Sequence, residues 1–381
     1  MPYKIAFLSK YPPIEGGISS KTYWLARGLA LRGHEIHVIT HDITAGREYS
    51  IKDDMEIPED SLNIQVHRTQ LDIPWHIPED NEYSLSLINT AIRVVNEQEI
   101  EILDSGYLVP YGIAGDITKL STQIPHIIRH GGSDLEKFLK QKHLQPLLNL
   151  ALSNADAVIT NRLHVNLFEH LTANLVFQPP YIPDESAFVP RNKLQLRRRL
   201  AVIGKINYHW QHKSLKLIAK IMENLADKFE CVIYGQGNGI DSFKESLKQD
   251  NLSNFKWSSF VGPWKMPGVL SQVDAIFVFE SNLPNPVFSN LVLEAAWMGV
   301  GIITDRQDFT DTYRDIVTLN KNQVLVVSPT DSELSAELIT RWVQDRISAE
   351  LDLQPLVSFK DYLSTNEELY ASIIQSDSNR H

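Results

Sequence analysis

A helix-like segment with a single acid marks the first candidate site. It runs from Phe288 to Gly299 and follows the apolar run 275–279, which is typical of a buried strand. Ser289 or Asn290 suits the helix N-cap, so the first amides have no partners inside the helix and the positive end of its dipole faces the preceding loop. Such a helix start can bind an anion such as phosphate.

Glu294 is that acid, and its neighbours Leu293, Ala295 and Ala296 are apolar. A charged side chain in this setting needs a hydrogen-bonding partner, which a ligand hydroxyl beside the bound anion would supply. The alternative is a glutamate favoured only by the helix dipole, and the residues alone leave both explanations open.

Two lysines earlier in the chain suit a diphosphate. Lys205 stands after Gly204, just past the strand-like run 200–203, and Lys213 follows shortly after. Their ammonium groups would neutralise a diphosphate opposite the helix start at Asn290. Most single lysines are plain surface residues, so this hypothesis depends on several features gathering at one edge of a sheet.

Two further features belong to the first half of the chain. Gly16 and Gly17 follow the strand-like run 4–9, and adjacent glycines let the backbone approach a ligand, although a flexible turn is the plain alternative. His130 follows the strand-like run 125–129, at the strand end where α/β sheets bind ligands. A lone histidine is more often structural, and four others in plainer contexts are interpreted that way: His126, His143, His164 and His170.

The elements that hold these residues alternate between strand-like and helix-like patterns, twice over. A proline-rich connector at 179–190 separates the halves, and parallel strands with helical crossovers predict a doubly wound sheet in each. The remaining strand-like runs are 36–40, 64–67, 101–104, 155–160, 231–234, 260–262, 301–304 and 324–327, and the main helical ones are 18–30, 84–96, 135–152, 215–225, 242–247 and 359–370.

We therefore expect an α/β protein whose two halves meet across a cleft. Residues 1–185 form the first domain and residues 199–355 form the second; the family resemblance described below implies that the first lies on the acceptor side and the second binds the donor. A C-terminal helix within 356–381 crosses back toward the first domain.

Composition excludes several classes of function. The net charge of −11 argues against a general nucleic-acid-binding protein, and 43% hydrophobic residues support folded cores. The single cysteine, Cys231, excludes a disulfide framework or a cysteine-based metal site. No apolar run is long enough for a membrane helix and the N-terminal one is too short for a signal peptide, so we expect a cytoplasmic protein.

The helix-like segment 135–152 carries a basic face formed by Lys137, Lys140, Lys142 and His143. A solvated face is the interpretation we favour. The alternative is contact with an anionic acceptor or with the inner face of a membrane.

Taken together, these motifs resemble glycosyltransferase family 4, the retaining group 1 transferases with the GT-B architecture of two Rossmann-like domains facing a central cleft. The resemblance covers nearly the whole chain and is specific as a set, although each piece alone is weak. It rests on Tyr11–Gly17, Arg129–Asp134, Gly204–Lys205 with Lys213, Phe288–Ala296 and the helix Phe359–Tyr370.

The resemblance implies a role for each donor-side motif. Lys205 and Lys213 would hold the two phosphates. The amides of Asn290 and Leu291 would bind the distal phosphate, and Glu294 the ribose hydroxyls. Lys205 takes the place of the family's usual arginine, exchanging a bidentate fork for a point charge that still suits phosphate. The donor-binding loops also contain Gly204, Ser289 and the pair Val261 and Gly262, which would face the base.

On the first domain, the resemblance places Gly16 and Gly17 beside the donor diphosphate and the acceptor, and His130 on the transferred sugar. One position departs from the family pattern. Where the family has a glutamate that contacts the donor sugar, this chain has Pro286. Glu280 or Asn285 could replace it, so the identity of the sugar stays open.

The reaction implied is glycosyl transfer with retention, from a nucleoside-diphosphate sugar to a glycan or lipid-linked acceptor, without a metal or cofactor. The lysines and the helix start would stabilise the charge of the leaving diphosphate. No Asp-x-Asp triplet, the divalent-cation clamp of the other major transferase fold, occurs in the sequence.

Two other functions fit the same residues. The missing glutamate suggests a nucleotide-sugar-binding protein with impaired catalysis, and a nucleotide-sugar epimerase can have the same architecture. The sequence leaves the donor base, the sugar, the acceptor and the oligomeric state open.

Overall fold

The structure of the chain is a computed structural model. It divides into two compact units, one made by the described residues up to Pro183 together with those from Val357 onward, and one made by those from Asp184 to Arg346. The residues that it describes are 2–14, 16–42, 62–69, 81–131, 133–139, 141–162, 164–191, 196–207, 210–279, 289–314, 317, 319, 322–346 and 357–378.

The first unit is built on a seven-stranded sheet in the order β3-β2-β1-β4-β5-β6-β7, and every pairing in it is parallel. Its strands are β1 (Lys4–Leu8), β2 (Glu35–Thr40), β3 (Ile64–Arg68), β4 (Ile102–Gly106), β5 (His126–Arg129), β6 (Ala157–Thr160) and β7 (Leu175–Phe177). The chain reverses its direction of travel across the sheet between β1 and β4, and ligands of such folds bind outside the strand ends at that point.

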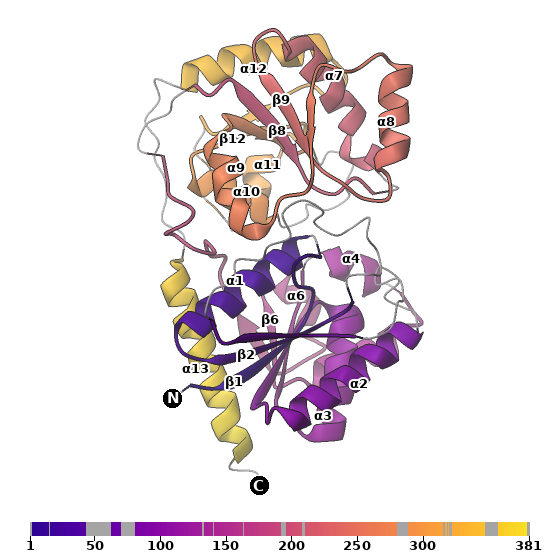
Figure 1. Cartoon of the computed structure of the whole chain (residues 1–381), viewed down its shortest axis with the longest axis vertical. Coiled ribbons are helices and arrows are strands. Elements are labelled where there is room, and N and C mark those ends of the chain that lie inside the picture. Colours follow the sequence, from indigo (N-terminus) through magenta and orange to yellow (C-terminus); the bar gives the residue numbers. More distant parts are fainter. Residues whose placement is uncertain are drawn as a thin grey trace. The chain divides into compact units, whose positions relative to one another are not determined.

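Helices cover both faces of this sheet (Figure 1). They are α1 (Gly17–Leu31), α2 (Asn81–Glu97), the π-helical turn η2 (Leu108–Gly112), α3 (Ile113–Thr122), α4 (Ser133–Phe138), α5 (Gln145–Asn154), α6 (Val165–Phe168) and α13 (Phe359–Ser378). Figure 1 shows α13 beside α1, with α2 and α3 on the other side of the sheet. Alternate strand residues face the two layers, so Leu103 packs in the α2 and α3 core whereas its neighbour Asp104 faces the opposite way.

The second unit repeats the plan with a six-stranded parallel sheet in the order β10-β9-β8-β11-β12-β13. Its strands are β8 (Arg199–Ile203), β9 (Glu230–Tyr234), β10 (Lys256–Ser258), β11 (Ala275–Phe277), β12 (Gly301–Thr304) and β13 (Val324–Val326). The order matches that of the dinucleotide-binding α/β proteins, with the switch point between β8 and β11.

The helices of the second unit are η3 (Trp210–Lys213), α7 (Leu215–Leu225), α8 (Ile240–Gln249), η4 (Pro263–Lys265), α9 (Met266–Ser271), α10 (Asn290–Trp297), α11 (Phe309–Tyr313) and α12 (Ser332–Arg346). Apolar residues of α7 and of the strands form most of its buried core. Two parallel, doubly wound sheets confirm the α/β, Rossmann-like fold predicted from the alternating pattern.

The structure corrects two sequence predictions and adds a strand that the sequence analysis missed. The helix predicted over 135–152 is two helices, α4 and α5; Pro146 stands in the first turn of α5, where a missing amide is tolerated but from which a helix cannot extend backwards. The strand predicted at 260–262 lies earlier, at β10, whose last residue, Ser258, pairs with Tyr234 at the end of β9; Pro263 then stands in the first turn of η4. The short strand β7 was not predicted at all.

Candidate active site

His130 leaves the sheet at the end of β5, and its ring is held on two sides. Its Nε2 lies 2.9 Å from Oγ1 of Thr160, the last residue of β6. The ring stacks on Phe168 with centroids 5.1 Å apart, and the ring of His164 meets it edge-on at 5.2 Å. The Nδ1 atom of His130 is buried and has no hydrogen-bond partner among the described residues. A buried nitrogen of this kind can be satisfied by a ligand.

The surroundings of His130 keep its ring neutral. Burial lowers its pKa well below the usual value, and His164 and Lys21 lower it further. Burial also lowers the pKa of the Lys21 ammonium on α1 to about 8, although Asp134 opposes the shift. His130 is therefore suited to hydrogen bonding with a polar ligand rather than to acting as a cation.

Asp134 organises the loop that follows His130. Its carboxylate accepts hydrogen bonds from the backbone amides of Gly131 and Leu108, both at 2.9 Å, and of Leu135 at 3.2 Å. Burial raises the pKa of Asp134, and these amides oppose that shift by stabilising its charged form. One side chain thus fixes both the start of η2 and the backbone next to His130.

The glycine pair lies on the connection from β1, which ends at Leu8, to α1. Gly16 has φ 125°, in the left-handed region that favours glycine, and Gly17 is the first residue of α1. The next residue, Ile18, packs on the loop after His130, since a Cβ on Gly131 would lie 2.6 Å from its Cδ1. The first unit therefore brings together the glycine pair and the His130 loop.

Lys205 follows β8 at the switch point of the second unit. Gly204 before it has φ 151°, a conformation that favours glycine, and donates its amide to the carbonyl of Tyr234 at 3.0 Å. The next amide, of Ile206, donates to the carbonyl of Gln236 at 3.0 Å. The loop that carries Lys205 is therefore pinned to the loop after β9.

The loop after β9 fits this backbone closely because it is rich in glycine. A Cβ on Gly237 would lie 2.5 Å from the carbonyl oxygen of Ile206, and one on Gly239 would lie 2.0 Å from that of Asn207. Gly237 also has φ 142°. Side chains at these positions would displace the Lys205 loop, and we call this segment, Gly235–Gly239, the glycine brace.

Helix α10 begins on the connection that follows β11, the strand adjacent to β8. Ser289 is its N-cap in an extended conformation and makes no side-chain capping hydrogen bond; Asn290 and Leu291 open the helix. Because β8 and β11 are parallel neighbours, Lys205 and the chain leading to α10 leave the sheet at the same edge.

Glu294 is 5% exposed in the interior of α10. Burial raises the pKa of its carboxyl to about 8, and burial is the one cause of that shift. No charged or hydrogen-bonding group among the described residues stabilises its ionised form. This distinguishes Glu294 from a glutamate that is simply favoured by the helix dipole in water.

Several sequence-predicted positions carry less structural information. Val261 and Gly262 lie between β10 and η4, outside any strand. Lys213 closes η3, and its side chain lies outside the described residues, as do Glu280, Asn285 and Pro286. Sequence reasoning missed the contacts of Thr160 and Phe168 with His130, and the cation Lys21, and it assigned a structural role to His164.

Within the described part of the chain, no cluster of His, Cys, Asp and Glu side chains could hold a metal ion. None of the helices described is both long and apolar enough to cross a membrane.

Comparisons with known proteins first give the class of protein. Sucrose-phosphate synthase from Thermosynechococcus elongatus shares the fold with a TM-score of 0.67 at 14% identity, covering 98% of this chain and 100% of that one. HepE from Anabaena, solved in complex with UDP-glucose, gives 0.60 at 14% identity, covering 99% of both. These likenesses establish the GT-B fold.

Sequence comparisons give the family. The family model described as glycosyl transferases group 1 matches residues 191–354, and that described as glycosyl transferase 4-like matches residues 19–162. The N-acetyl-alpha-D-glucosaminyl L-malate synthase of Bacillus anthracis is 23% identical over 197 residues, which is 50% of this chain and 49% of that protein. The match therefore spans about half the length of this curated relative. The chain belongs to the group 1, family 4-like glycosyltransferases.

Proposed function

We propose that this protein is a retaining glycosyltransferase that moves a sugar from a nucleoside-diphosphate sugar to a glycan or lipid-linked acceptor. Family membership supports glycosyl transfer as the reaction class. The solved complex of HepE with UDP-glucose supports a nucleotide sugar as the donor. The donor base, the sugar and the acceptor are what the experiment below identifies.

The observation that carries the proposal is the environment of Glu294. The carboxyl of Glu294 is buried in a helix and has no stabilising partner among the described residues, an arrangement that costs free energy unless something binds it. The helix that carries it starts from the sheet edge that Lys205 also leaves. A ligand with an anionic diphosphate and neighbouring hydroxyls satisfies both features, and a nucleoside diphosphate has both.

Catalysis in this proposal is electrostatic. When the bond between sugar and diphosphate breaks, negative charge grows on the leaving phosphate, and Lys205, Lys213 and the first amides of α10 would stabilise it. Protein cations and dipoles take the place that a divalent ion holds in other transferases. We therefore propose that the reaction needs no metal.

On the first unit, His130 is assigned to the transferred sugar and the loop at Gly16 and Gly17 to the diphosphate and acceptor. The neutral ring of His130, whose buried Nδ1 has no hydrogen-bond partner in the described part of the chain, supports hydrogen bonding to a sugar hydroxyl. Neutrality matters because an imidazolium cannot accept a hydrogen bond from that hydroxyl.

The test is a donor panel of uridine, guanosine and adenosine diphosphate sugars, incubated with and without glycan and lipid-linked acceptors. Nucleotide release that requires an acceptor, with the anomeric configuration of the product retained by proton NMR, supports the proposal. An inverted product contradicts retention. Epimer formation without acceptor would assign the protein to the epimerases, and binding without turnover would make it a nucleotide-sugar-binding protein.

A further inference from the structure

Arg129, the last residue of β5, precedes His130 and makes a buried ion pair with Asp104 on β4. Its Nε lies 2.8 and 2.9 Å from the two carboxylate oxygens of Asp104, and its Nη2 lies 2.7 Å from Oδ2. Asp104 is 0% exposed. A guanidinium held by both oxygens of a carboxylate is fixed in orientation as well as in position.

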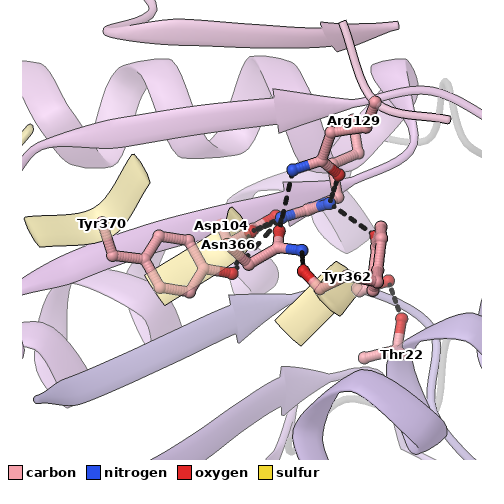
Figure 2. Close-up of polar contacts among 8 residues, drawn as sticks. Thr22, Asp104, Arg129, Tyr362, Asn366 and Tyr370 are labelled. Atoms are coloured by element: carbon pink, nitrogen blue, oxygen red, sulfur yellow. Dashed lines mark hydrogen bonds and ion pairs between the residues drawn. The ribbon is translucent and has the colours of Figure 1, made fainter. Parts of the chain in front are cut away.

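Other donors of Arg129 are directed to helix α13, as Figure 2 shows. Its Nη1 donates to the hydroxyl of Tyr362 at 3.1 Å, and its Nη2 donates to Oδ1 of Asn366 at 2.5 Å. The hydroxyl of Tyr370 lies 3.3 Å from Nη2 and donates to Oδ2 of Asp104 at 2.8 Å. These three residues recur every fourth position, so they share one face of the helix.

The charge states of this cluster are stable around neutral pH. Burial by itself would lower the pKa of the Arg129 guanidinium, but Asp104 and the two tyrosines raise it well above its usual value. Burial, and then the carboxylate of Asp104, raise the pKa of Tyr370. Tyr370 therefore stays protonated and keeps donating to Asp104.

A second path leads from α13 to the ring of His130. The side chain of Gln178 donates to Oδ1 of Asn366 at 3.2 Å and accepts from Nη1 of Arg129 at 3.1 Å. The backbone amide of Gln178 donates to the carbonyl of Thr160 at 3.0 Å, and the Thr160 hydroxyl contacts Nε2 of His130. Helix α13 is thus linked to His130 by two routes, one through Arg129, the preceding residue, and one through Thr160, the hydrogen-bond partner of the ring.

Helix α13 also makes a second set of contacts with the first unit, and these do not involve β5. Arg32, just after α1, donates from Nη1 to Oγ of Ser364 at 3.0 Å and from Nη2 to the carbonyl of Lys360 at 2.6 Å, and it pairs with Glu367. A buried ion pair is a poor source of net stability because both charges lose their hydration. Attachment of α13 therefore does not by itself explain why the ion pair of Arg129 with Asp104 lies directly beside His130.

We infer that Arg129 is a positioning residue for the proposed transfer, through which Tyr362, Asn366 and Tyr370 of the C-terminal helix fix the end of β5 and the ring of His130. The inference rests on the proposed function only where it assigns His130 to the sugar. The mechanical link between α13 and His130 is independent of that assignment.

The test compares Tyr370→Phe and Asn366→Ala with the control Arg32→Ala. Tyr370→Phe and Asn366→Ala each remove contacts between α13 and the Arg129–Asp104 pair but leave the pair itself intact. Arg32→Ala instead removes the contacts between α13 and the end of α1. We expect turnover to fall by about tenfold in the first two, with the affinity for the preferred nucleoside diphosphate unchanged, because small displacements of a reacting group reduce rates strongly. The control variant, Arg32→Ala, should keep both the turnover and the nucleotide affinity of the unmodified protein.

A readout without activity uses protein labelled with carbon-13 and nitrogen-15 in its histidines. The ring signal of His130, identified by its loss in His130→Ala, should move in Tyr370→Phe and in Asn366→Ala but not in Arg32→Ala. A signal that stays in place in both folded variants, or that moves equally in the control, overturns the inference. If the unmodified protein transfers no sugar, the proposed function fails, while this NMR comparison still decides whether α13 positions His130.

Discussion

Nε2 of His130 lies 2.9 Å from Oγ1 of Thr160, and this contact determines what the other ring nitrogen can do. The Thr160 hydroxyl is placed to donate toward the carbonyl of Asn161 at 3.5 Å. When it does so, it accepts the proton of Nε2, and Nδ1 then carries a lone pair. The buried Nδ1 becomes a hydrogen-bond acceptor that a sugar hydroxyl can fill.

Replacing His130 with alanine should reduce turnover roughly tenfold to a hundredfold with little change in nucleotide affinity, because the ring is assigned to the sugar and not to the diphosphate. Thr160→Val is the matched variant. It keeps the shape of the side chain but removes the hydroxyl that orients the ring, so its loss of turnover should be smaller. Steady-state kinetics and calorimetry with the preferred nucleoside diphosphate measure both, and equal losses in turnover and affinity would count against the sugar-side role.

Lys213→Ala should weaken nucleoside-diphosphate binding by ~1.5–3 kcal/mol, the range for a hydrogen bond to a charged group. The control is Lys216→Ala on α7, because Lys216 already pairs with Asp250 at 3.0 Å. Calorimetry should show an unchanged affinity in that control. An unchanged affinity in Lys213→Ala itself would remove Lys213 from the donor site.

Glu294 should make the protein less stable as pH rises. The carboxyl has a pKa of 4.5 when solvated and about 8 in the folded chain. Between these values the unfolded chain releases the proton while the folded chain keeps it, so the free energy of unfolding falls by up to ~1.4 kcal/mol per pH unit. Above about pH 8 both states are ionised and this contribution becomes constant.

The neutral isostere Glu294→Gln removes this titration. Its melting temperature relative to the unmodified protein should therefore be higher at pH 8 than at pH 5. Glu337→Gln, on the exposed side of α12, is the control and should show no such trend. A difference for Glu294→Gln that is the same at both pH values would show that the carboxyl is ionised in the folded chain at pH 5 already.

Gly237→Ala should destabilise the second unit by about 1–3 kcal/mol, because the residue has positive φ and a Cβ would press on the carbonyl of Ile206. The same displacement moves the loop that carries Lys205, so nucleotide affinity should fall as well. Gly268→Ala is the control, since a Cβ there meets nothing within 4 Å. Urea unfolding and nucleotide calorimetry measure the two effects; loss of stability with full affinity would separate the glycine brace from the donor site.

Activity should persist in EDTA, since protein cations and the start of α10 are proposed to stabilise the leaving diphosphate. Nucleotide release in the presence of acceptor, measured before and after chelation and again after Mg²⁺ is restored, is the check. Activity that disappears with the chelator and returns with Mg²⁺ would refute the charge-compensation mechanism.

The sequence by itself determined the architecture of this protein. Apolar runs alternating with amphipathic segments specify parallel strands and crossover helices through local periodicity, and this is why the two doubly wound sheets could be predicted. The same local information placed Gly16, Lys205 and the start of α10 after strands of the two sheets, and a parallel sheet gathers the ends of its strands at one edge.

Periodicity is less informative where a segment is short or its stop signal is subtle. The break between α4 and α5 depends on a single proline, Pro146, inside a run that otherwise continues the pattern, and β10 is only three residues long and ends where its partner β9 ends. The sequence analysis named Arg129 and Asp134 only as the ends of the segment that contains His130, although Arg129 pairs with Asp104 and Asp134 binds the amide of Gly131 next to His130.

Only the tertiary structure decided which charged and polar groups contact one another and which of them are buried. Arg129, Asp104 and Tyr370 come from two strands and the C-terminal helix, and the lowered pKa of Lys21 and the raised pKa of Glu294 result from burial. A hydrogen bond or a desolvated charge depends on distances of a few ångströms between residues far apart in the chain, and residue types and local spacing do not encode those distances.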